Sequence, residues 1–421
     1  MSGMSEGDWV DLGFMLGRVF RPATPVNQAE LFSGRKDQVR KVVDAINQPG
    51  CHAILYGERG VGKTSLANIL FSKLHSNGLP LLIPHINGIN SDTYTTIWRR
   101  VFDEMQFRLE ETSCEIPESL SKAVESSTSL FQSEVTPDQV RRVLTECGRT
   151  FLLVVVIDEF DSVEDPDARR TIADTVKFLS DRNAPVTIVL IGVADDVDDL
   201  IDNHQSVERC VSQVALPRMS RDEIEEVVTS GLKKHGMTID ADALHEVSRI
   251  SRGLPHYAHL LGLHSGRKSI DRRSMNVAVP DIREALKLAI DDVQASIKSD
   301  YVKATTSARI DALYKHVLLA AALAECDELG FFYPKDVRPT LSRILNEEKS
   351  IDTFAKHLNA FCDIKRGGVL YKDSNTDRPR YRFDNPLLQP YVLIRGLTDG
   401  LLTEDDLKHT RNKTDPQKRL F

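Results

Sequence analysis

One short stretch, GERGVGKT at residues 57–64, constrains the fold of this chain more than any other feature of its sequence. It satisfies the pattern G-x-x-x-x-G-K-[ST] at every fixed position. An apolar, strand-forming run at 52–57 precedes it, and a run with helical periodicity at 63–78 follows it. Glycines allow positive φ angles, which let backbone N–H groups approach an anion closely. A strand, a glycine-rich bend and a helix N-terminus in this order predict a phosphate-binding loop.

Residues 57–64, called the phosphate loop from here on, have individual expected roles. Lys63 is expected to reach the β- and γ-phosphates of a nucleotide, and Thr64 to place its hydroxyl on Mg²⁺. The full set expected to bind the nucleotide in this segment is Gly57, Glu58, Arg59, Gly60, Val61, Gly62, Lys63, Thr64 and Ser65. The alternative interpretation is a glycine turn with an accidental lysine.

A second candidate element is the run TFLLVVVIDEFD at residues 150–161, which carries acidic side chains at its end. A strand that is apolar on both faces belongs in the middle of a parallel sheet covered by helices. Asp158 is expected to hold Mg²⁺ through its carboxylate, and Glu159 to orient or deprotonate an attacking water. Two carboxylates at the end of an apolar strand are costly unless a metal or a partner offsets their charge. The alternative is a solvated strand end, and we expect Asp161 to be a helix cap or a surface residue.

Strands and helices alternate along the first half of the chain. Further strand-like runs follow at 79–87 and 184–195, with helical patterns between the strands. This alternation predicts an α/β fold with a doubly wound parallel sheet. After Pro217 the pattern is helical throughout 218–293, which predicts a small all-helical unit. From residue 308 on, helices lead into two strand-like runs around a polar turn, an order that fits a winged helix.

The predicted organisation therefore has four parts. They are an N-terminal segment (1–30), an α/β core that holds the phosphate loop (31–217), a helical lid (218–295) and a winged-helix-like C-terminal domain (296–421).

The composition excludes several other classes of protein. Hydrophobic residues make up 41 % of the 421 residues, enough to build cores rather than a disordered chain. The net charge of −8 argues against a basic nucleic-acid coat, although a local basic patch is compatible with it. Six scattered cysteines without a C-x-x-C pair argue against a zinc site and against a disulfide scaffold. The acidic N-terminus is unlike a secretory signal and the apolar runs are too short to span a bilayer, so we expect a soluble cytoplasmic protein with no membrane partner.

With both motifs in place, the layout over residues 18–386 resembles an AAA+ ATPase. It is most similar to the initiator clade, the origin-recognition and replication-initiator ATPases with their bacterial and archaeal relatives. The resemblance implies that the chain binds ATP and Mg²⁺, hydrolyses ATP and self-associates in an ATP-dependent manner.

Two further segments match the family more loosely. Upstream of the phosphate loop, the resemblance places Pro25, Val26, Gly34 and Arg35 near adenine, and the alternative is an ordinary turn with a surface arginine. After the third predicted strand, the sensor-1 position of the family, usually a polar residue such as asparagine, is Asp195. An acid near the γ-phosphate would be repelled unless it held water, a metal or an arginine, and a helix N-cap is the alternative role.

Two more candidate sites depend on the resemblance. Arg209 falls where similar proteins carry an arginine finger, which acts on the nucleotide of a neighbouring subunit; in a monomer it would be an ordinary surface arginine. Pro255 belongs to a Gly-Leu-Pro run that resembles the G-x-P motif of STAND-type and archaeal-type ATPases. His256 stands about where initiators have a sensor-2 arginine and is expected near the γ-phosphate, the alternative being a packed or capping histidine. Arg252 is a weaker candidate for the same role.

The predicted winged helix offers a candidate DNA-binding surface. Within residues 365–382, six basic residues stand against two acidic ones, so binding of duplex DNA through 356–382 is expected to weaken steeply with salt. Lys356 and His357 on the preceding helix are expected to face a groove. The alternative is a solvated hairpin whose charges meet acidic helices of the same chain.

The sequence as a whole predicts a Mg²⁺-dependent ATPase. Glu159 aligns the water that attacks the γ-phosphate, while Lys63 and a neighbour's Arg209 stabilise the developing charge. Two roles stay open at this point. One is a DNA-associated motor or loader, and the other is a STAND-like signalling or defence switch with a protein partner, which the Gly-Leu-Pro-His run favours.

Overall fold

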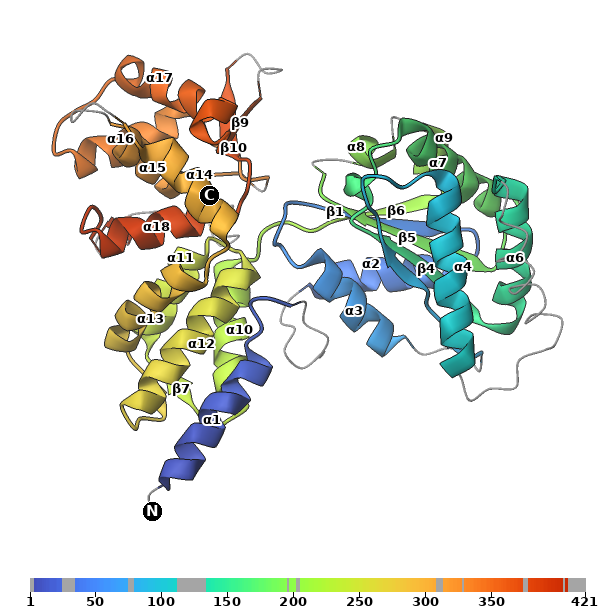
Figure 1. The fold of residues 1–421 in the computed structure, drawn as a ribbon, viewed down its shortest axis with the longest axis horizontal. Helices are drawn as coiled ribbons and strands as arrows, with labels where there is room; N and C mark the ends of the chain where they lie inside the picture. The colour runs from blue at the N-terminus through green and yellow to red at the C-terminus, as the bar shows by residue number, and fades with distance from the viewer. Residues whose placement is uncertain are drawn as a thin grey trace, which may run out of the picture.

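The computed structural model shows an α/β part beside a column of helices, and the column continues into a C-terminal unit (Figure 1). It describes residues 4–24, 35–74, 79–111, 134–194, 197–201, 205–307, 313–327, 329–373, 378–403 and 406–407.

The α/β part is built on a parallel sheet that has six strands within the described residues. The strand order is β2-β4-β5-β1-β6, and β3 also pairs with β4. The strands are β1 (His52–Tyr56), β2 (Leu81–Leu82), β3 (His85–Asn87), β4 (Leu152–Asp158), β5 (Val186–Gly192) and β6 (Val211–Ala215). Every pairing in this sheet is parallel, which confirms the predicted α/β fold class.

Helices cover both faces of the sheet, as the all-apolar β4 requires. Alternate residues of β4 enter two different cores: Val154 and Val156 join the core that includes α2 and α3, whereas Leu153 and Val155 join the core of α4, α6 and α7. The helices of this part are α2 (Lys36–Asn47), α3 (Lys63–Lys73), α4 (Tyr94–Glu111), α6 (Pro137–Thr150), α7 (Pro166–Asp181), α8 (Asp198–Ile201) and α9 (Gln205–Glu208), with a short 3₁₀ turn η2 (Phe160–Ser162) after β4.

The helical lid follows the sheet. Its first helix is capped by Ser220, where the Ser220 hydroxyl accepts the Glu223 N–H at 3.2 Å and the Glu223 carboxylate accepts the Ser220 N–H at 2.7 Å. This reciprocal pair satisfies two N–H groups that the first turn of a helix leaves without partners. The elements of the lid are α10 (Arg221–Lys233), β7 (Thr238–Ile239), α11 (Ala241–Ser251), α12 (Pro255–Asp271), β8 (Asn276–Val277) and α13 (Val279–Asp292).

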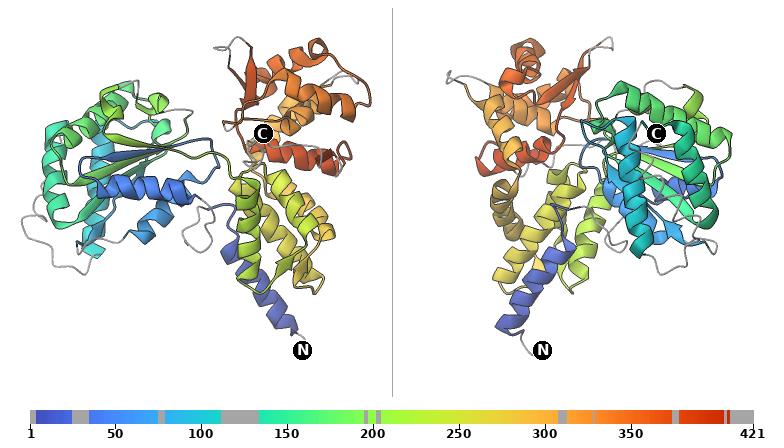
Figure 2. Two further views of the ribbon diagram at one scale, coloured as in Figure 1. Left: turned by 180° about the vertical axis from the view of Figure 1, so that it is seen from behind. Right: turned by 45° about the vertical axis from the view of Figure 1, so that its right-hand side comes forward.

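The N-terminal helix α1 (Glu6–Val19) lies along the lid, far from α2 in space (Figures 1 and 2). It packs on α12 and α10 through an apolar face that includes Trp9, Leu12 and Leu16. The predicted N-terminal segment therefore contributes its described helix to the lid.

The C-terminal unit stacks on the lid on the side away from α1 (Figure 2). Its elements are α14 (Ala295–Thr305), α15 (Tyr314–Leu323), α16 (Pro334–Ile344), α17 (Ile351–Phe361), η3 (Ile364–Arg366), β9 (Leu370–Asp373), β10 (Arg380–Phe383) and α18 (Leu388–Thr398). Strands β9 and β10 pair antiparallel, and Phe332 forms a single bridge with Tyr381 beside them. Helices followed by a hairpin agree with the predicted order of elements; the winged-helix assignment and the four domain boundaries stay predictions.

Within the described residues, none of the helices is both long and hydrophobic enough to cross a lipid bilayer.

Candidate nucleotide-binding site

The phosphate loop connects the carboxyl end of β1 to the first turn of α3. Gly57, Gly60 and Gly62 all have positive φ angles, of 148°, 83° and 96°. A side chain at Gly57 would collide with the carbonyl oxygen of Leu216, which directly follows the neighbouring strand β6, so only glycine fits there. The backbone conformation that an anion-binding loop requires is therefore present, and the loop ends at the N-terminus of an 11-residue helix.

Lys63 is folded back onto the loop that precedes it. Its Nζ donates hydrogen bonds to the carbonyl oxygens of Gly57 and Glu58, both at 2.9 Å. Burial lowers the pKa of Lys63 to about 8, while the carboxylates of Asp161 and Asp158 act in the opposite direction. The side chain is thus still largely protonated at neutral pH, and its charge is held within the loop.

Asp158 ends β4 directly beside the loop, and its carboxylate is buried. One oxygen accepts the N–H of Glu159 at 2.7 Å, and the other lies 3.7 Å from Nε2 of His85. Burial alone would raise the pKa of Asp158, but hydrogen bonds from His85, Thr64 and the Glu159 backbone outweigh it and lower the pKa. Asp158 is therefore ionised at neutral pH.

The oxygen atoms of Thr64 and Asp158 fit a magnesium ion. They interact with each other at the edge of the cavity, and hydroxyl and carboxylate oxygens are the ligands that Mg²⁺ prefers. No group of three or more His, Cys, Asp or Glu side chains that could hold a metal occurs in the described part of the chain. A magnesium ion here would accordingly take its other ligands from water and phosphate, as is usual for this ion.

Glu159 follows in a left-handed backbone conformation with φ of 51°, which is uncommon for a residue other than glycine. The Glu159 carbonyl packs closely against Gly88. A Cβ at Gly88 would lie 2.7 Å from the Glu159 carbonyl oxygen. The carboxylate is exposed and lines the cavity beside Asp158. Such a locally strained residue next to a candidate metal ligand is a pattern typical of functional sites.

These groups line one cavity of about 560 Å³, within the usual size range of ligand sites. Of the predicted residues, the cavity brings together Arg59, Gly60, Gly62, Lys63, Thr64, Ser65, Asp158, Glu159, Pro255 and His256. Gly57, Glu58 and Val61 are not among its lining residues. Three cationic side chains, Arg21, Arg59 and Lys63, share the lining with three carboxylates, Asp158, Glu159 and Asp161. The mixture suits a polyphosphate that carries a divalent cation.

The lid contributes Pro255 and His256 from the start of α12. A Cβ at Gly62 would lie 3.7 Å from Pro255 Cγ, so the proline packs against the loop. Nδ1 of His256 donates a hydrogen bond of 2.7 Å to the carbonyl of Pro22, and burial lowers the pKa of His256. The imidazole is therefore neutral and ties the lid to the segment before the loop; contact with the γ-phosphate stays a prediction.

Arg209 does not line the cavity. Its side chain is 72 % exposed, and Nη2 lies 3.3 Å from Asp181 Oδ1. It precedes β6, whose Val211 pairs with His52 at the amino end of β1, whereas the phosphate loop follows the carboxyl end of β1. Arg209 therefore lies toward the amino end of the strands, away from the phosphate loop at their carboxyl end, and its role as an arginine finger stays a prediction.

Five more residues were predicted to lie near the nucleotide. Pro25, Val26, Gly34 and Asp195 lie outside the described residues. Arg35 is buried behind the loop and does not line the cavity: its Nη2 donates to the carbonyls of Val61 and Pro217. The alternative of a surface arginine is therefore wrong, and the place of Arg35 near adenine stays a prediction.

Arg252 does not line the cavity either. It is buried, and its Nη2 donates to the carbonyl of Ala324 in the C-terminal unit at 2.8 Å. The structure thus gives it a role in packing the lid against that unit.

The structure adds residues that the sequence did not indicate. Asp161, expected to be a cap or a surface residue, lines the cavity instead, and its carboxylate accepts the N–H of Val193 after β5 at 2.8 Å. His259, one turn after His256, lines the cavity as well, and burial lowers its pKa to about 4. A signal for Asp161 was present in the sequence, because it is the third acidic residue of the DEFD run at 158–161. Leu387 from the C-terminal unit also lines the cavity and had no local signal in the sequence.

Comparison with known protein families agrees with this site. The model of the family described as Novel STAND NTPase 1 matches residues 23–301, well over half of the chain. The chain belongs to this family. The match includes the phosphate loop, Asp158 at the end of β4, Glu159 after it and the Gly-Leu-Pro-His run, so the resemblance to STAND-type NTPases that the sequence predicted is confirmed.

Solved structures share the fold of this NTPase. The Walker-type ATPase PABY2304 of Pyrococcus abyssi is 15 % identical with a TM-score of 0.53, and the alignment covers 89 % of this chain and 99 % of that one. The ORC2 protein of Aeropyrum pernix, solved as ADPNP–ADP complexes, is 13 % identical with a TM-score of 0.51 over 91 % and 97 % of the two chains. At these identities the likeness shows the fold alone. No curated protein matches the sequence.

Proposed function

We propose that the chain binds ATP with Mg²⁺ in the cavity described above and hydrolyses it. The observation that carries the proposal is the convergence of the phosphate loop, Asp158 and Glu159 on one cavity of about 560 Å³. The loop amides and the N-terminus of α3 hold the phosphates, and Lys63 leaves its two carbonyl partners to contact the β- and γ-phosphates.

Thr64 and Asp158 would hold a magnesium ion through their oxygens. The ion would supply positive charge that offsets the negative charge of the phosphates during transfer. Glu159, whose carboxylate is free to face the cavity, aligns and deprotonates the attacking water. Asp161 holds the end of β5 against these acids through the Val193 N–H.

Replacing Glu159 tests the hydrolytic step directly. Glu159→Gln keeps the shape of the side chain but removes the base, so turnover is expected to fall by about 10²–10⁴-fold while ATP affinity is retained. Steady-state phosphate release and equilibrium binding of ATP measure the two quantities. Turnover at the wild-type rate would refute the role of Glu159, whereas loss of binding would show that the residue holds the nucleotide.

We further propose that ATP binding and hydrolysis switch the association of the chain with itself and with a protein partner. The family match supports a switch of the STAND type, and the position of Arg209 at the edge of the sheet remote from its own phosphate loop supports an oligomer with shared sites. ATP at a subunit junction favours assembly, and hydrolysis releases it.

Duplex DNA is a second candidate partner, through residues 356–382. The positive charge of the hairpin supports it, although the guanidinium groups of Arg380 and Arg382 also lie 4.0 and 4.8 Å from the centre of the Phe331 ring of the same chain. Part of this charge is already neutralised, because Arg380 pairs with Asp373 at 2.9 Å and with Asp327 at 3.3 Å.

Helix α17, which precedes the hairpin, contributes less to a DNA-binding surface than the sequence predicted. His357 is buried and lies 4.7 Å, ring centre to ring centre, from Tyr314, so the expectation that it faces a groove is wrong. Charge reversal at Arg378, Arg380 and Arg382 is expected to abolish DNA binding at low salt if this surface binds a duplex. Absence of binding by the wild type at low salt would leave the protein partner as the remaining role.

A further inference from the structure

A buried ion pair connects the phosphate loop to the start of the lid. Nε of Arg218 donates to Glu58 Oε2 at 2.6 Å, and Nη2 donates to Glu58 Oε1 at 3.2 Å. The two side chains are 9 % and 6 % exposed. Burial would lower the pKa of Arg218, but the Glu58 carboxylate outweighs it and raises the pKa. A two-point contact of this kind fixes both position and orientation of the carboxylate.

The same guanidinium also binds the C-terminal unit. Its Nη1 donates to Oε1 of Gln389 on α18 at 2.5 Å, and Nε2 of Gln389 donates in turn to the carbonyl of Ala322 on α15 at 2.9 Å. Gln389 is 1 % exposed. Because Arg218 can only donate and the Ala322 carbonyl can only accept, the orientation of the amide is fixed. The hydrogen bonds thus run without a break from the loop, through the lid, to the core of the C-terminal unit.

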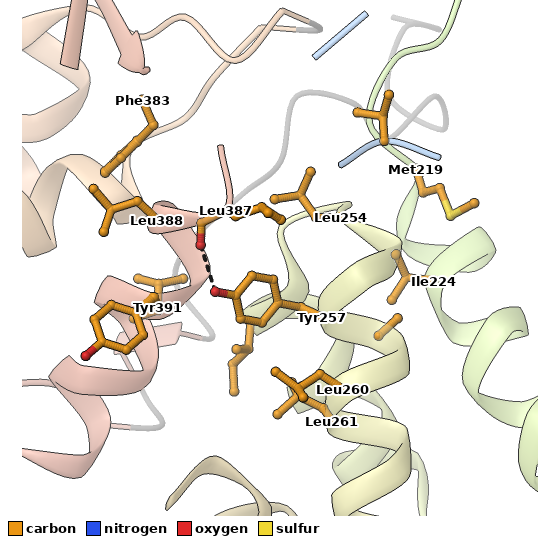
Figure 3. Packing of buried hydrophobic residues seen from close by; sticks show 14 of the residues in the cluster. Met219, Ile224, Leu254, Tyr257, Leu260, Leu261, Phe383, Leu387, Leu388 and Tyr391 are labelled. Atoms are coloured by element: carbon orange, nitrogen blue, oxygen red, sulfur yellow. Dashed lines mark hydrogen bonds between the residues drawn. The ribbon is translucent and has the colours of Figure 1, made fainter. Parts of the chain in front are cut away.

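Apolar and backbone contacts hold the C-terminal unit at the same place. Figure 3 shows Leu387 between the lid residues Leu254 and Tyr257, and the Tyr257 hydroxyl donates to the Leu387 carbonyl at 2.7 Å. A Cβ at Gly60 in the loop would lie 3.0 Å from Leu387 Cδ2. Gly330, with φ of 79°, packs so closely on the ion pair that a Cβ there would collide with Glu58 Oε1.

We propose that Arg218 and Gln389 are positioning residues that set the conformation of the phosphate loop, so that docking of the C-terminal unit and nucleotide binding strengthen each other. The inference rests on the proposed function, because it assigns a partner surface to the same nucleotide site. Neither side chain lines the cavity, so neither contacts the nucleotide; both act through Glu58.

The physical reason lies in the backbone of Glu58. Its carbonyl is one of the two acceptors that hold Lys63, and its neighbours in the loop supply the amides for the phosphates. Pinning the Glu58 side chain preorganises this backbone and lowers the cost of ordering it around a ligand. Linkage then requires the converse: bound nucleotide, which orders the loop, stabilises the docked C-terminal unit by the same free energy.

Gln389→Leu removes the acceptor for Arg218 at nearly constant volume. Loss of a hydrogen bond to a charged group is expected to weaken binding of the non-hydrolysable analogue AMP-PNP and of ADP by about tenfold. At saturating ATP, kcat is expected to change by less than about threefold, because the catalytic groups are intact. Gln389→Glu keeps an acceptor for Arg218 and is expected to lie closer to the wild type.

Gly330→Ala provides an independent test from a different segment. Its methyl group would push on Glu58. Gly400→Ala is the matched control, because Gly400 has the same kind of left-handed backbone, with φ of 70°, but nothing lies within 4 Å of a Cβ there. The first variant is expected to weaken AMP-PNP binding, and the second is not. Leu358→Ala in α17 controls for general destabilisation of the C-terminal unit, because Leu358 is buried there and plays no part in the hydrogen-bonded chain.

The outcomes are distinguishable. Weaker binding by Gln389→Leu and Gly330→Ala, with Gly400→Ala and Leu358→Ala unchanged, supports the inference. Wild-type or tighter binding by Gln389→Leu overturns it, because the contact would then be idle or opposed to nucleotide binding. Lys63→Ala separates this result from the proposed function: if that variant binds AMP-PNP as the wild type does, the nucleotide site itself is wrong.

Discussion

Lys63 is the residue whose charge most directly connects the observed loop to nucleotide binding. Burial lowers its pKa to about 8. Phosphate oxygens around the ammonium favour its charged form, so they raise this pKa when the nucleotide binds. Binding above pH 8 must therefore take up a proton, since free protein loses that proton as the pH rises through 8.

The affinity for nucleotide is therefore expected to fall at alkaline pH. Nucleotide affinity is expected to be constant between pH 7 and 7.5 and to fall as the pH rises from 8 to 9.5, by up to about tenfold per pH unit. Lys63→Arg is the matched control, because a guanidinium stays charged over this range and its affinity is expected to be flat. Calorimetric titration with AMP-PNP at each pH measures the effect, and a flat wild-type profile would show that Lys63 is not the group that titrates.

The sequence predicted the positions of residues with a local signal. Lys63 and Thr64 belong to the motif after β1, and Asp158 and Glu159 to the motif at the end of β4. The four residues line one cavity, and their chemical roles stay predictions. Asp161 was misjudged because its role depends on Val193, which is adjacent only after β4 and β5 pair in the sheet.

At the scale of elements, Phe20 at the C-terminal end of α1 adds an aromatic side chain to the apolar face that packs on the lid. Phe20 is 1 % exposed and sits against glycines of two lid helices. A Cβ would lie 2.5 Å from its ring at Gly231 in α10 and 2.7 Å at Gly262 in α12. The two glycines therefore make the space that Phe20 occupies.

Gly262→Ala is expected to displace Phe20 and to destabilise the protein by about 1–3 kcal/mol, the usual cost of overpacking a core. Gly13→Ala in the middle of α1 is the control: nothing lies within 4 Å of its Cβ, and removing a helical glycine stabilises by about 0.5–1 kcal/mol. Urea unfolding of both variants checks the pair. Equal stability of the two would show that Phe20 does not hold α1 in place.

Element boundaries were predictable where capping residues mark them, as Ser220 and Glu223 do for α10. The docking of α1 was not predictable, because the sequence shows an amphipathic helix without showing its partner. Its acceptor surface is created by glycines on two helices more than 200 residues away in the chain.

For the whole molecule, the order of motifs was enough to predict the parallel sheet and the helices that follow it, since crossover connections leave few alternatives. The contact between the phosphate loop and the C-terminal unit could not be predicted from the sequence. It joins Glu58, Arg218 and Gln389, three residues that no local pattern relates.

The proposed sharing of sites between subunits is tested at the scale of the assembly. Arg209→Ala retains its own loop and acids, and Glu159→Gln retains its Arg209, so a mixture contains junctions with one complete site. ATPase activity of the mixture is expected to exceed the sum of the two separate variants, because an arginine finger contributes about 10³–10⁵ in rate. A mixture that only adds the two residual activities would rule out Arg209 as a residue acting between subunits.

The central claim is that this cavity holds a magnesium nucleotide on the phosphate loop. Calorimetric titration of the full chain with AMP-PNP and Mg²⁺, in parallel with Lys63→Ala, tests it most directly. The account predicts saturable binding by the wild type and affinity at least about tenfold lower for the variant. Equal affinity of the two proteins, or no binding by the wild type, would contradict it.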